Sequence, residues 1–574
     1  MTYSFIFRSR IVLACVVLFA LVLVAKLFFV QIVHGGAYSE SADRQYSTPR
    51  GDIYERGTIF FQKKGKGDEM QLISAATQAS GFKAAINPGK ISDAEDVYQK
   101  LNKIVPIHHD DFIWQAARVN DPYEEVANHL SKEKADAIAA LKIPGVSIFK
   151  EKWRFYPGGG LASHVLGLVG YKGSELGGRY GLERQWNDQL RRDEGSPYIN
   201  FFAEVFSNIN KTFFNEEISE GDVITTIEPT VQSFLEKKLM EVKESYQADS
   251  VGGIIMNPAD GSIYAMGAKP DFDPNNFSEV ENIAVFSNPL VENVLEFGSV
   301  IKPLVMAAGL DAGAVTADST YDDKGSVIVE KKEIFNFDKM GRGPGTSMQT
   351  VLGQSLNTGM VFVEQKLGRE RLREYLLAYG IKEKTGIDLP NETSGLVSNL
   401  DSPREIEYAN AAFGQGIAIS PIILIRAFSS LANGGNLVVP HIVKEIKYDT
   451  GVSKKITREV KRAKITPETS EEITRMLVKV MDEAIAGGTA KLEHFSVAVK
   501  TGTAQVADSA AGGYYEDRHT HSFVGYFPAY DPEFIVLLYA VNPKGVQYAA
   551  TTWSKPFLDI TKFLLNYYEI PPDR

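Results

Sequence analysis

One short stretch constrains the fold of this 574-residue chain more than any other: Gly298-Ser299-Val300-Ile301-Lys302-Pro303. It opens the apolar run 304–308, which predicts a helix, because a proline is tolerated in a first helical turn. Residues three apart lie on one face of a helix, so Ser299 and Lys302 should be neighbours at its N-terminus. A hydroxyl beside an amine, at the positive end of a helix dipole, is a candidate nucleophile with its base.

Two further motifs strengthen this hypothesis, since a Ser-x-x-Lys pair alone is weak support. The same spacing recurs elsewhere in the chain, for example at Ser131-Lys132-Glu133-Lys134, which a simple helix cap explains. The only Ser-x-Asn is Ser355-Leu356-Asn357, and Lys500-Thr501-Gly502-Thr503 follows it. Ser-x-x-Lys, Ser-x-Asn and Lys-Thr-Gly in this order are typical of one class of serine acyltransferase.

The Lys-Thr-Gly motif also occurs twice. Lys384-Thr385-Gly386 follows two charged residues and leads towards Pro390, which predicts a loop. The second copy follows Phe495-Ser496-Val497-Ala498-Val499, a run that predicts a strand. The chemistry needs a rigid strand edge, so the functional copy is predicted to be the one at Lys500.

With these motifs, the chain resembles a class B penicillin-binding protein, a membrane-anchored peptidoglycan D,D-transpeptidase, and is most similar to the division-specific type. The resemblance runs from about residue 50 to about residue 565. Phe297 is a departure, because members of the family often have proline at this position, and it affects the turn rather than the chemistry. The supporting stretches are Arg50-Gly51-Asp52-Ile53, Tyr180-Gly181-Leu182-Glu183, Phe413-Gly414-Gln415-Gly416 and His521-Ser522-Phe523-Val524-Gly525.

The expected fold class is α+β. Strand-like segments come early and late, and they suggest one antiparallel sheet built from both ends of a domain, with a helical middle at about 298–490. The resemblance implies a penicillin-recognising serine transferase domain at 222–574, and a mixed α/β pedestal without catalytic residues at 34–221. The segments expected to be strands are 251–256, 262–266, 496–501, 521–527 and 533–541, and the expected helices include 228–248 and 556–568.

Residues 11–33 form a 23-residue run that is almost entirely apolar. As a helix it would extend about 34 Å, enough to cross a hydrocarbon core of about 30 Å. It is longer than the core of a cleavable signal peptide, and no Ala-x-Ala site follows it cleanly. Arg8 and Arg10 precede it and no Lys or Arg follows until Arg44. The positive-inside rule therefore predicts a cytoplasmic head at 1–10 and an exported remainder.

Composition excludes several other classes. The net charge of −11 argues against a nucleic-acid partner. Cys15 is the only cysteine, so neither a disulfide framework nor a cysteine metal site is expected. The pair His519 and His521 is interpreted as structural, with zinc binding in a loop as the minor alternative. No metal or organic cofactor is expected.

The resemblance implies a role for each motif residue in acyl transfer from a D-Ala-D-Ala peptide end. Ser299 would form the acyl-enzyme, and a neutral Lys302 would act as base, its pKa lowered by burial and by a nearby lysine. The backbone amides of Ser299 and Thr503 would form the oxyanion hole. The remaining expected roles are proton relay for Ser355, binding of the substrate amide for Asn357, charge for Lys500, carboxylate binding for Thr501 and Thr503, and close approach of substrate for Gly502.

Three alternatives remain at this point: a D,D-carboxypeptidase, a β-lactam sensor or hydrolase, and an inactive scaffold for wall synthesis. The expected partners are peptidoglycan stem peptides, β-lactam antibiotics and a multipass membrane peptidoglycan polymerase. The expected location is the bacterial cytoplasmic membrane, crossed once, with the catalytic domain outside. Lys26 within the span would either reach the outer interface or contact another membrane protein. The sequence does not indicate whether the protein serves division or elongation, which residue of the stem is the acceptor, whether an outer membrane exists, or what the oligomeric state is.

The segment 504–520 joins two of the predicted strands and contains paired glycines. Small residues and glycines favour low local order. We expect a loop that is either a mobile lid beside the active site or a passive connection.

Overall fold

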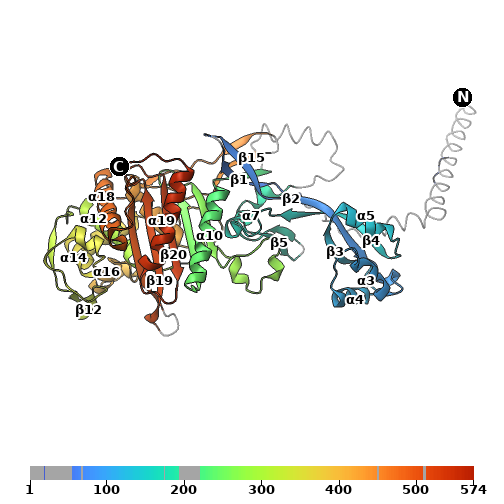
Figure 1. The fold of residues 1–574 in the computed structure, drawn as a ribbon, viewed down its shortest axis with the longest axis horizontal. Coiled ribbons are helices and arrows are strands. Elements are labelled where there is room, and N and C mark those ends of the chain that lie inside the picture. Colours follow the sequence, from blue (N-terminus) through green and yellow to red (C-terminus); the bar gives the residue numbers. More distant parts are fainter. Residues whose placement is uncertain are drawn as a thin grey trace, which may run out of the picture. The chain divides into compact units, whose positions relative to one another are not determined.

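The computed structural model describes residues 55–65, 67, 69–173, 175–192, 220–448, 451–507 and 512–574, with Phe19 and Leu23. The predicted head at 1–10 and almost all of the predicted span at 11–33 lie outside these residues. Within the described ranges, no helix is both long and apolar enough to cross a membrane. The described chain forms two compact units, one of Glu55 with Gln78–Trp153 and the other of Arg56–Thr77 with Arg154–Arg574 (Figure 1).

The smaller unit is a sheet with helices. Strand β2 pairs with β3 in an antiparallel ladder, Ile86 opposite Glu124, and β4 also pairs with β2. The core is made of Ile86, Leu101, Phe112, Leu130, Ile138 and their neighbours. The elements are α3 (Ala94–Asn102), α4 (His109–Ala116), β3 (Glu124–Leu130) and α5 (Lys132–Ala140), with the part of β2 (Met70–Ile86) from Gln78 onward and the part of β4 (Val146–Phe155) up to Trp153.

The central sheet of the larger unit has five strands in the order β18-β19-β20-β8-β9, all antiparallel to their neighbours. Two strands come from the start of the predicted domain and three from its end, so the predicted sheet is confirmed. The strands are β8 (Ser250–Met256), β9 (Ile263–Lys269), β18 (Ala498–Ala507), β19 (Tyr514–Phe527) and β20 (Phe534–Val541).

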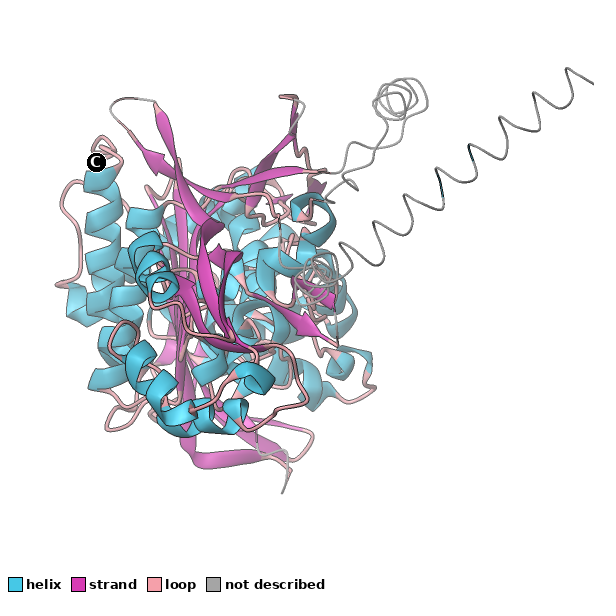
Figure 2. Cartoon of the chain, turned by 90° about the vertical axis from the view of Figure 1, so that its right-hand side faces the viewer, coloured by secondary structure: helices cyan, strands magenta, loops and turns pink. Residues whose placement is uncertain are grey.

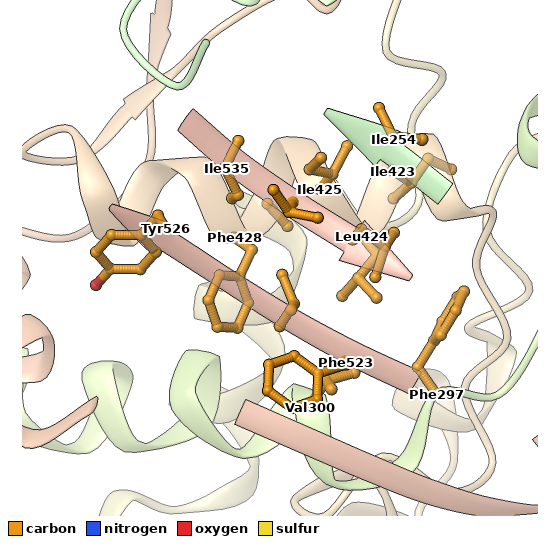
Figure 3. Packing of buried hydrophobic residues seen from close by; sticks show 14 of the residues in the cluster. Ile254, Phe297, Val300, Ile423, Leu424, Ile425, Phe428, Phe523, Tyr526 and Ile535 are labelled. Atoms are coloured by element: carbon orange, nitrogen blue, oxygen red, sulfur yellow. The ribbon is translucent and has the colours of Figure 1, made fainter. Parts of the chain in front are cut away.

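Side chains alternate along the strands, and each face of this sheet carries helices. Phe523 stacks on Phe557 of α19 at 4.4 Å between ring centroids. Tyr526, on the opposite face, donates to or accepts from Thr474 of α18 at 2.7 Å and lies 6.2 Å from the ring of Phe428 in α17 (Figure 3). Figure 2 shows the strands running between helical layers. The helices are α10 (Pro229–Ser245), α17 (Pro421–Ala432), α18 (Pro467–Glu483) and α19 (Ala549–Tyr567).

A second sheet of the larger unit joins distant parts of the chain. Its strands have the order β16-β15-β7-β1-β2, and β1 is parallel to β7. Beside it, the fully buried Glu183 accepts hydrogen bonds from Arg56 and Arg154, each at 2.6 Å. The compact unit therefore takes in parts of the segment predicted as pedestal as well as 222–574. The elements are β1 (Ile59–Lys64), α7 (Gly181–Gln185), β7 (Gly221–Thr225), β15 (Val443–Tyr448) and β16 (Ser453–Lys455).

The loop predicted at 504–520 is mostly strand, which corrects that expectation. Ala504 pairs with Thr520, Gln505 with His519 and Ala507 with Tyr514, so β18 and β19 continue as a hairpin. The flanking residues include Val, Tyr, His and Thr, which suit a pleated surface, while the turn-forming residues gather near the tip. Residues 508–511 lie outside the described part of the chain.

Candidate active site

Ser299 lies on η5 (Gly298–Ile301), a single 3-10 turn that leads into α12 (Lys302–Asp311). The predicted helix is thus present, but its first turn is tighter than an α-helix. Gly298 has a φ of +58°, and a Cβ there would lie 2.9 Å from the carbonyl oxygen of Thr503. Glycine is required here because the turn meets the backbone of strand β18.

Gly502 brings the same two elements together from the other side. A Cβ on Gly502 would lie 2.3 Å from the carbonyl oxygen of Phe297 and 2.5 Å from the hydroxyl of Ser522. Ser522 donates to that carbonyl of Phe297 at 3.1 Å. The structure thus supplies a reason for this glycine that differs from the expected approach of substrate: the backbone that leads into the Ser299 turn fills the space.

The amine of Lys302 is the centre of a buried polar cluster. The Lys302 side chain is 0 % exposed. Its Nζ donates to the carbonyl oxygen of Ser355 at 2.6 Å, to Oδ1 of Asn357 at 2.8 Å and to the Ser355 hydroxyl at 3.2 Å. Lys500 donates to the same hydroxyl at 3.1 Å and to the carbonyl of Thr501 at 2.8 Å. The three predicted motifs therefore come together at Ser355, which contacts Lys302 of the first motif and Lys500 of the third.

Ser355 can present both oxygens to Lys302 because of its backbone. It lies between α13 (Met348–Gly353) and α14 (Asn357–Leu367), and its φ is +55°. A residue other than glycine in the left-handed region costs free energy, and such residues are common at functional sites. Asn357, the first residue of α14, donates from Nδ2 to the carbonyl of Phe335 at 2.9 Å. That bond orients the amide so that its oxygen faces Lys302.

The two lysines differ in their electrostatic environment. Burial, followed by the charge of Lys500, holds the pKa of Lys302 well below its usual range. Burial lowers the pKa of Lys500 to about 7. Two positive charges beside the Ser355 hydroxyl would repel each other, so protonation of both lysines at once is unfavourable. The site therefore favours a neutral Lys302 beside a Lys500 that keeps its proton longer.

The remaining predicted residues line the same region. Ser299 is half-buried, and within the described part of the chain its hydroxyl makes no hydrogen bond to Lys302. Thr501 and Thr503 are half-buried on β18, two residues apart and so on one side of the strand. The Thr503 hydroxyl accepts from the backbone amide of Ala549 at 3.2 Å and keeps its own proton to donate.

Other copies of two motifs, Ser131-Lys132-Glu133-Lys134 and Lys384-Thr385-Gly386, have structural roles. Ser131 caps α5 by accepting from the amide of Lys134 at 3.4 Å, as predicted. Thr385 lies in a loop, also as predicted, where its hydroxyl donates to Glu392 at 2.6 Å.

His521 is fully buried, with Nδ1 2.9 Å from the Thr552 hydroxyl. Among residues that the structure describes, no three His, Cys, Asp or Glu side chains are placed to hold a metal ion.

Sequence reasoning missed contacts that the residues around Ser299 make. Gly414, quoted above only for the resemblance, has a φ of +87°, and a Cβ there would lie 2.0 Å from the carbonyl of Gly298. Glu296 accepts a hydrogen bond from the Tyr514 hydroxyl, 3.1 Å from each carboxylate oxygen. No local pattern marks either contact, since the partners lie on segments far apart in sequence.

Together, the antiparallel sheet, the turn that bears the serine and the two converging lysines define a serine acyltransferase. Residues 251–562 match the family model of the penicillin-binding protein transpeptidase domain, and residues 46–225 match that of the penicillin-binding protein dimerisation domain. The chain belongs to the class B penicillin-binding proteins, which are serine-type D,D-transpeptidases. Its α+β fold combines the dimerisation domain, or pedestal, with the transpeptidase domain.

Individual relatives agree with this assignment. Stage V sporulation protein D of Bacillus subtilis is 30% identical over 95% of this chain and 83% of its own length. The peptidoglycan D,D-transpeptidase FtsI of Buchnera aphidicola is 26% identical over 98% of this chain and 96% of its own. The crystal structure of penicillin binding protein 2X from Streptococcus thermophilus has a TM-score of 0.70 at 21% identity, covering 89% of this chain and 79% of that one. At that identity the likeness supports the fold alone.

Proposed function

We propose that this penicillin-binding protein cross-links peptidoglycan stem peptides through an acyl-enzyme on Ser299. The observation that carries the proposal is the buried amine of Lys302, three residues further on, which shares the hydroxyl of Ser355 with Lys500 at 3.2 and 3.1 Å. A neutral amine can accept a proton, and a second, charged amine in the same cluster can bind an anion. The two lysines thus have separate tasks.

In the first half of the reaction, Ser299 Oγ attacks the carbonyl of the penultimate D-Ala. Lys302 takes the hydroxyl proton as the C–O bond forms, and the tetrahedral oxygen gains a negative charge. The backbone amides of Ser299 and Thr503 are the proposed donors to that oxygen, and losing one such donor typically costs about 10²–10³ in rate. The proton then reaches the leaving amine through the Ser355 hydroxyl, and D-Ala departs.

In the second half, the amine of another stem peptide attacks the ester on Ser299. The same groups work in reverse: a base takes the proton of the amine, and the serine oxygen leaves and is protonated. The product is a new amide bond between two stems, and Ser299 is regenerated. A β-lactam enters the first half in place of the peptide, and its opened ring remains attached to the serine.

Strand β18 is the proposed docking edge for the donor peptide. It is the terminal strand of the five-stranded sheet, and an edge strand can bind an extended peptide by backbone hydrogen bonds. Thr501 and Thr503 would donate their hydroxyls to the terminal carboxylate, with Lys500 supplying positive charge. Asn357 would use its remaining hydrogen-bonding capacity on the substrate amide.

Labelling of the full-length chain with a tagged penicillin tests the nucleophile. The wild type and Ser131→Ala should both be labelled, and the adduct should map to the peptide that contains Ser299. Ser299→Ala should take up no label. An adduct on any other residue would show that the assignment of the nucleophile is wrong.

Product analysis with a pentapeptide-bearing glycan separates the acceptors. A cross-linked dimer shows transfer to an amine, whereas trimmed monomer alone shows a D,D-carboxypeptidase. A persistent adduct, with the excess antibiotic left intact, indicates a β-lactam target, whereas rapid turnover to hydrolysed antibiotic indicates a hydrolase. Absence of both label and product would support the scaffold alternative.

We propose further that residues 11–33 anchor the chain in the bacterial cytoplasmic membrane, with 1–10 inside and the pedestal (34–221) and catalytic domain (222–574) outside. Lys26 within this apolar run supports a contact with another membrane protein, because an ionised group there is costly unless paired or snorkelled. A multipass peptidoglycan polymerase is the proposed partner. Exchanging 11–33 for an unrelated apolar helix should preserve penicillin labelling and impair co-purification with the polymerase; unchanged co-purification would leave the segment as an anchor only.

A further inference from the structure

Two residues outside the three motifs, Glu296 and Tyr514, meet beside the nucleophile. The Tyr514 hydroxyl lies 3.1 Å from each carboxylate oxygen of Glu296. Glu296 stands three residues before Ser299, and Tyr514 begins β19, the partner strand of β18. The contact thus joins the segment that carries the nucleophile to the far part of the hairpin that carries Thr503.

The residues on either side of Glu296 are held by other parts of the larger unit. Leu295 exchanges two backbone hydrogen bonds with Ile419, at 2.9 and 3.0 Å. The carbonyl of Phe297 accepts from Ser522 of β19 at 3.1 Å. Between these two anchors, the side chain of Glu296 makes the connection to the hairpin beyond Thr503.

A third segment reaches the same carboxylate. Burial raises the pKa of Glu296, and hydrogen bonds from Tyr514 and from the backbone of Gly416 counter that rise. The backbone of Gly416 also faces the Tyr514 hydroxyl. Two residues earlier, Gly414 lies against the carbonyl of Gly298, so this loop contacts both Glu296 and the turn of Ser299.

We propose that Glu296 is a positioning residue for acylation: through Tyr514 it fixes the β18–β19 hairpin against the Ser299 turn and so sets the spacing of the Ser299 and Thr503 amides. The inference rests on the proposed role of Ser299. Oxyanion donors work through geometry set before the reaction, so a displaced hairpin weakens transition-state binding more than ground-state binding. The rate constant of acylation should fall, and the dissociation constant of the non-covalent complex should not.

The test uses the full-length chain and a reporter penicillin, with stopped-flow kinetics that separate the dissociation constant from the acylation rate constant. The variants are Tyr514→Phe, Glu296→Ala, Glu296→Gln and the double variant Glu296→Ala/Tyr514→Phe. The matched control is Tyr515→Phe, because the neighbouring Tyr515 packs its ring on Arg518 at 4.2 Å. Its hydroxyl makes no hydrogen bond to any residue that the structure describes.

We expect Tyr514→Phe and Glu296→Ala to lower the acylation rate constant about tenfold each, the scale of a lost hydrogen bond to a charged group. The double variant should be no slower than either single one, and Glu296→Gln, which keeps an acceptor oxygen, should recover most of the rate. In these variants the dissociation constant and the unfolding temperature should match those of the wild type. The Tyr515→Phe control should match the wild type in its acylation rate constant as well.

Equal rates for Tyr514→Phe and Tyr515→Phe would overturn the proposal. So would additive losses in the double variant, or losses that follow the unfolding temperature, since these indicate independent or purely structural effects. The proposed function fails separately: if Ser299→Ala were still labelled, the nucleophile would be wrong whatever the behaviour of Glu296.

Discussion

The Nζ atoms of Lys302 and Lys500 approach the same atom, the hydroxyl oxygen of Ser355, at 3.2 and 3.1 Å. Lys302 comes from the helix after Ser299 and Lys500 from the edge strand, so a single hydroxyl links both sides of the site. Because the two lysines reach this hydroxyl from different elements, replacing one should not have the same effect on the reaction as replacing the other.

Replacing Lys500 by alanine should weaken both recognition and chemistry. The proposed positive charge for the ligand carboxylate is lost, and Ser355 loses a hydrogen-bond donor, so labelling by a penicillin should fall by at least about 10²-fold. Lys384→Ala is the matched control, because it alters the other Lys-Thr-Gly, in the loop. Stopped-flow labelling of both variants checks the assignment. A Lys384 variant as slow as the Lys500 variant would show that the wrong copy was chosen.

Acylation should have a bell-shaped pH profile. The low-pH limb reports deprotonation of Lys302, whose pKa is held well below its usual range by burial and then by Lys500. The high-pH limb reports loss of the proton from Lys500, whose pKa burial lowers to about 7. A bound carboxylate stabilises the charged lysine, so saturating ligand should move the high-pH limb upward. Rates measured at low and saturating penicillin would contradict this if the two profiles coincided.

Removing the charge of Glu183 should destabilise the larger unit. Glu183 is fully buried, and its carboxylate accepts from Arg56 and Arg154 at 2.6 Å each. Glu183→Ala leaves two buried guanidinium groups without their acid, a change that typically costs about 3–5 kcal/mol. Thermal or denaturant unfolding measures it. The control, Glu175→Gln, alters an exposed acid and should stay within about 0.5 kcal/mol of the wild type.

Glu364→Gln should stabilise the protein at high pH and leave it unchanged at low pH. Burial, then the charge of Glu405, raises the pKa of Glu364 to about 7. The unfolded state releases its proton at about pH 4–5 and the folded state only at about pH 7, so stability falls as pH rises from about 4 to about 7. Glutamine removes this dependence. Unfolding temperatures at about pH 4 and about pH 8 check it, with the exposed Glu370→Gln as control; an equal gain at both values would contradict the stated cause.

Much of the fold could be predicted from local pattern. The strands of the central sheet, the helix after Ser299 and the structural roles of Ser131 and Thr385 follow from alternation, capping and turn chemistry. The hairpin extension at 504–520 was misjudged, because small residues near its tip masked strand-forming residues on either side. Its pairing depends on the partner strand, which composition does not report.

The sequence by itself determined the class of chemistry. Three short motifs place a serine, a lysine, an amide and a second lysine on elements with the right local geometry, and spacing within a turn or strand is a property of the chain alone. The flanking sequence also distinguished the two copies of Lys-Thr-Gly, since charged residues precede Lys384 and a strand precedes Lys500.

Only the tertiary structure decided how these groups meet. Lys302 lies 53 residues from Ser355, and Lys500 lies 145 residues from it. The left-handed backbone of Ser355, and the contact of Glu296 with Tyr514 218 residues away, have no signature in local sequence. Periodicity reports which face of an element is buried, whereas these contacts arise when a helix, a loop and an edge strand pack against one another.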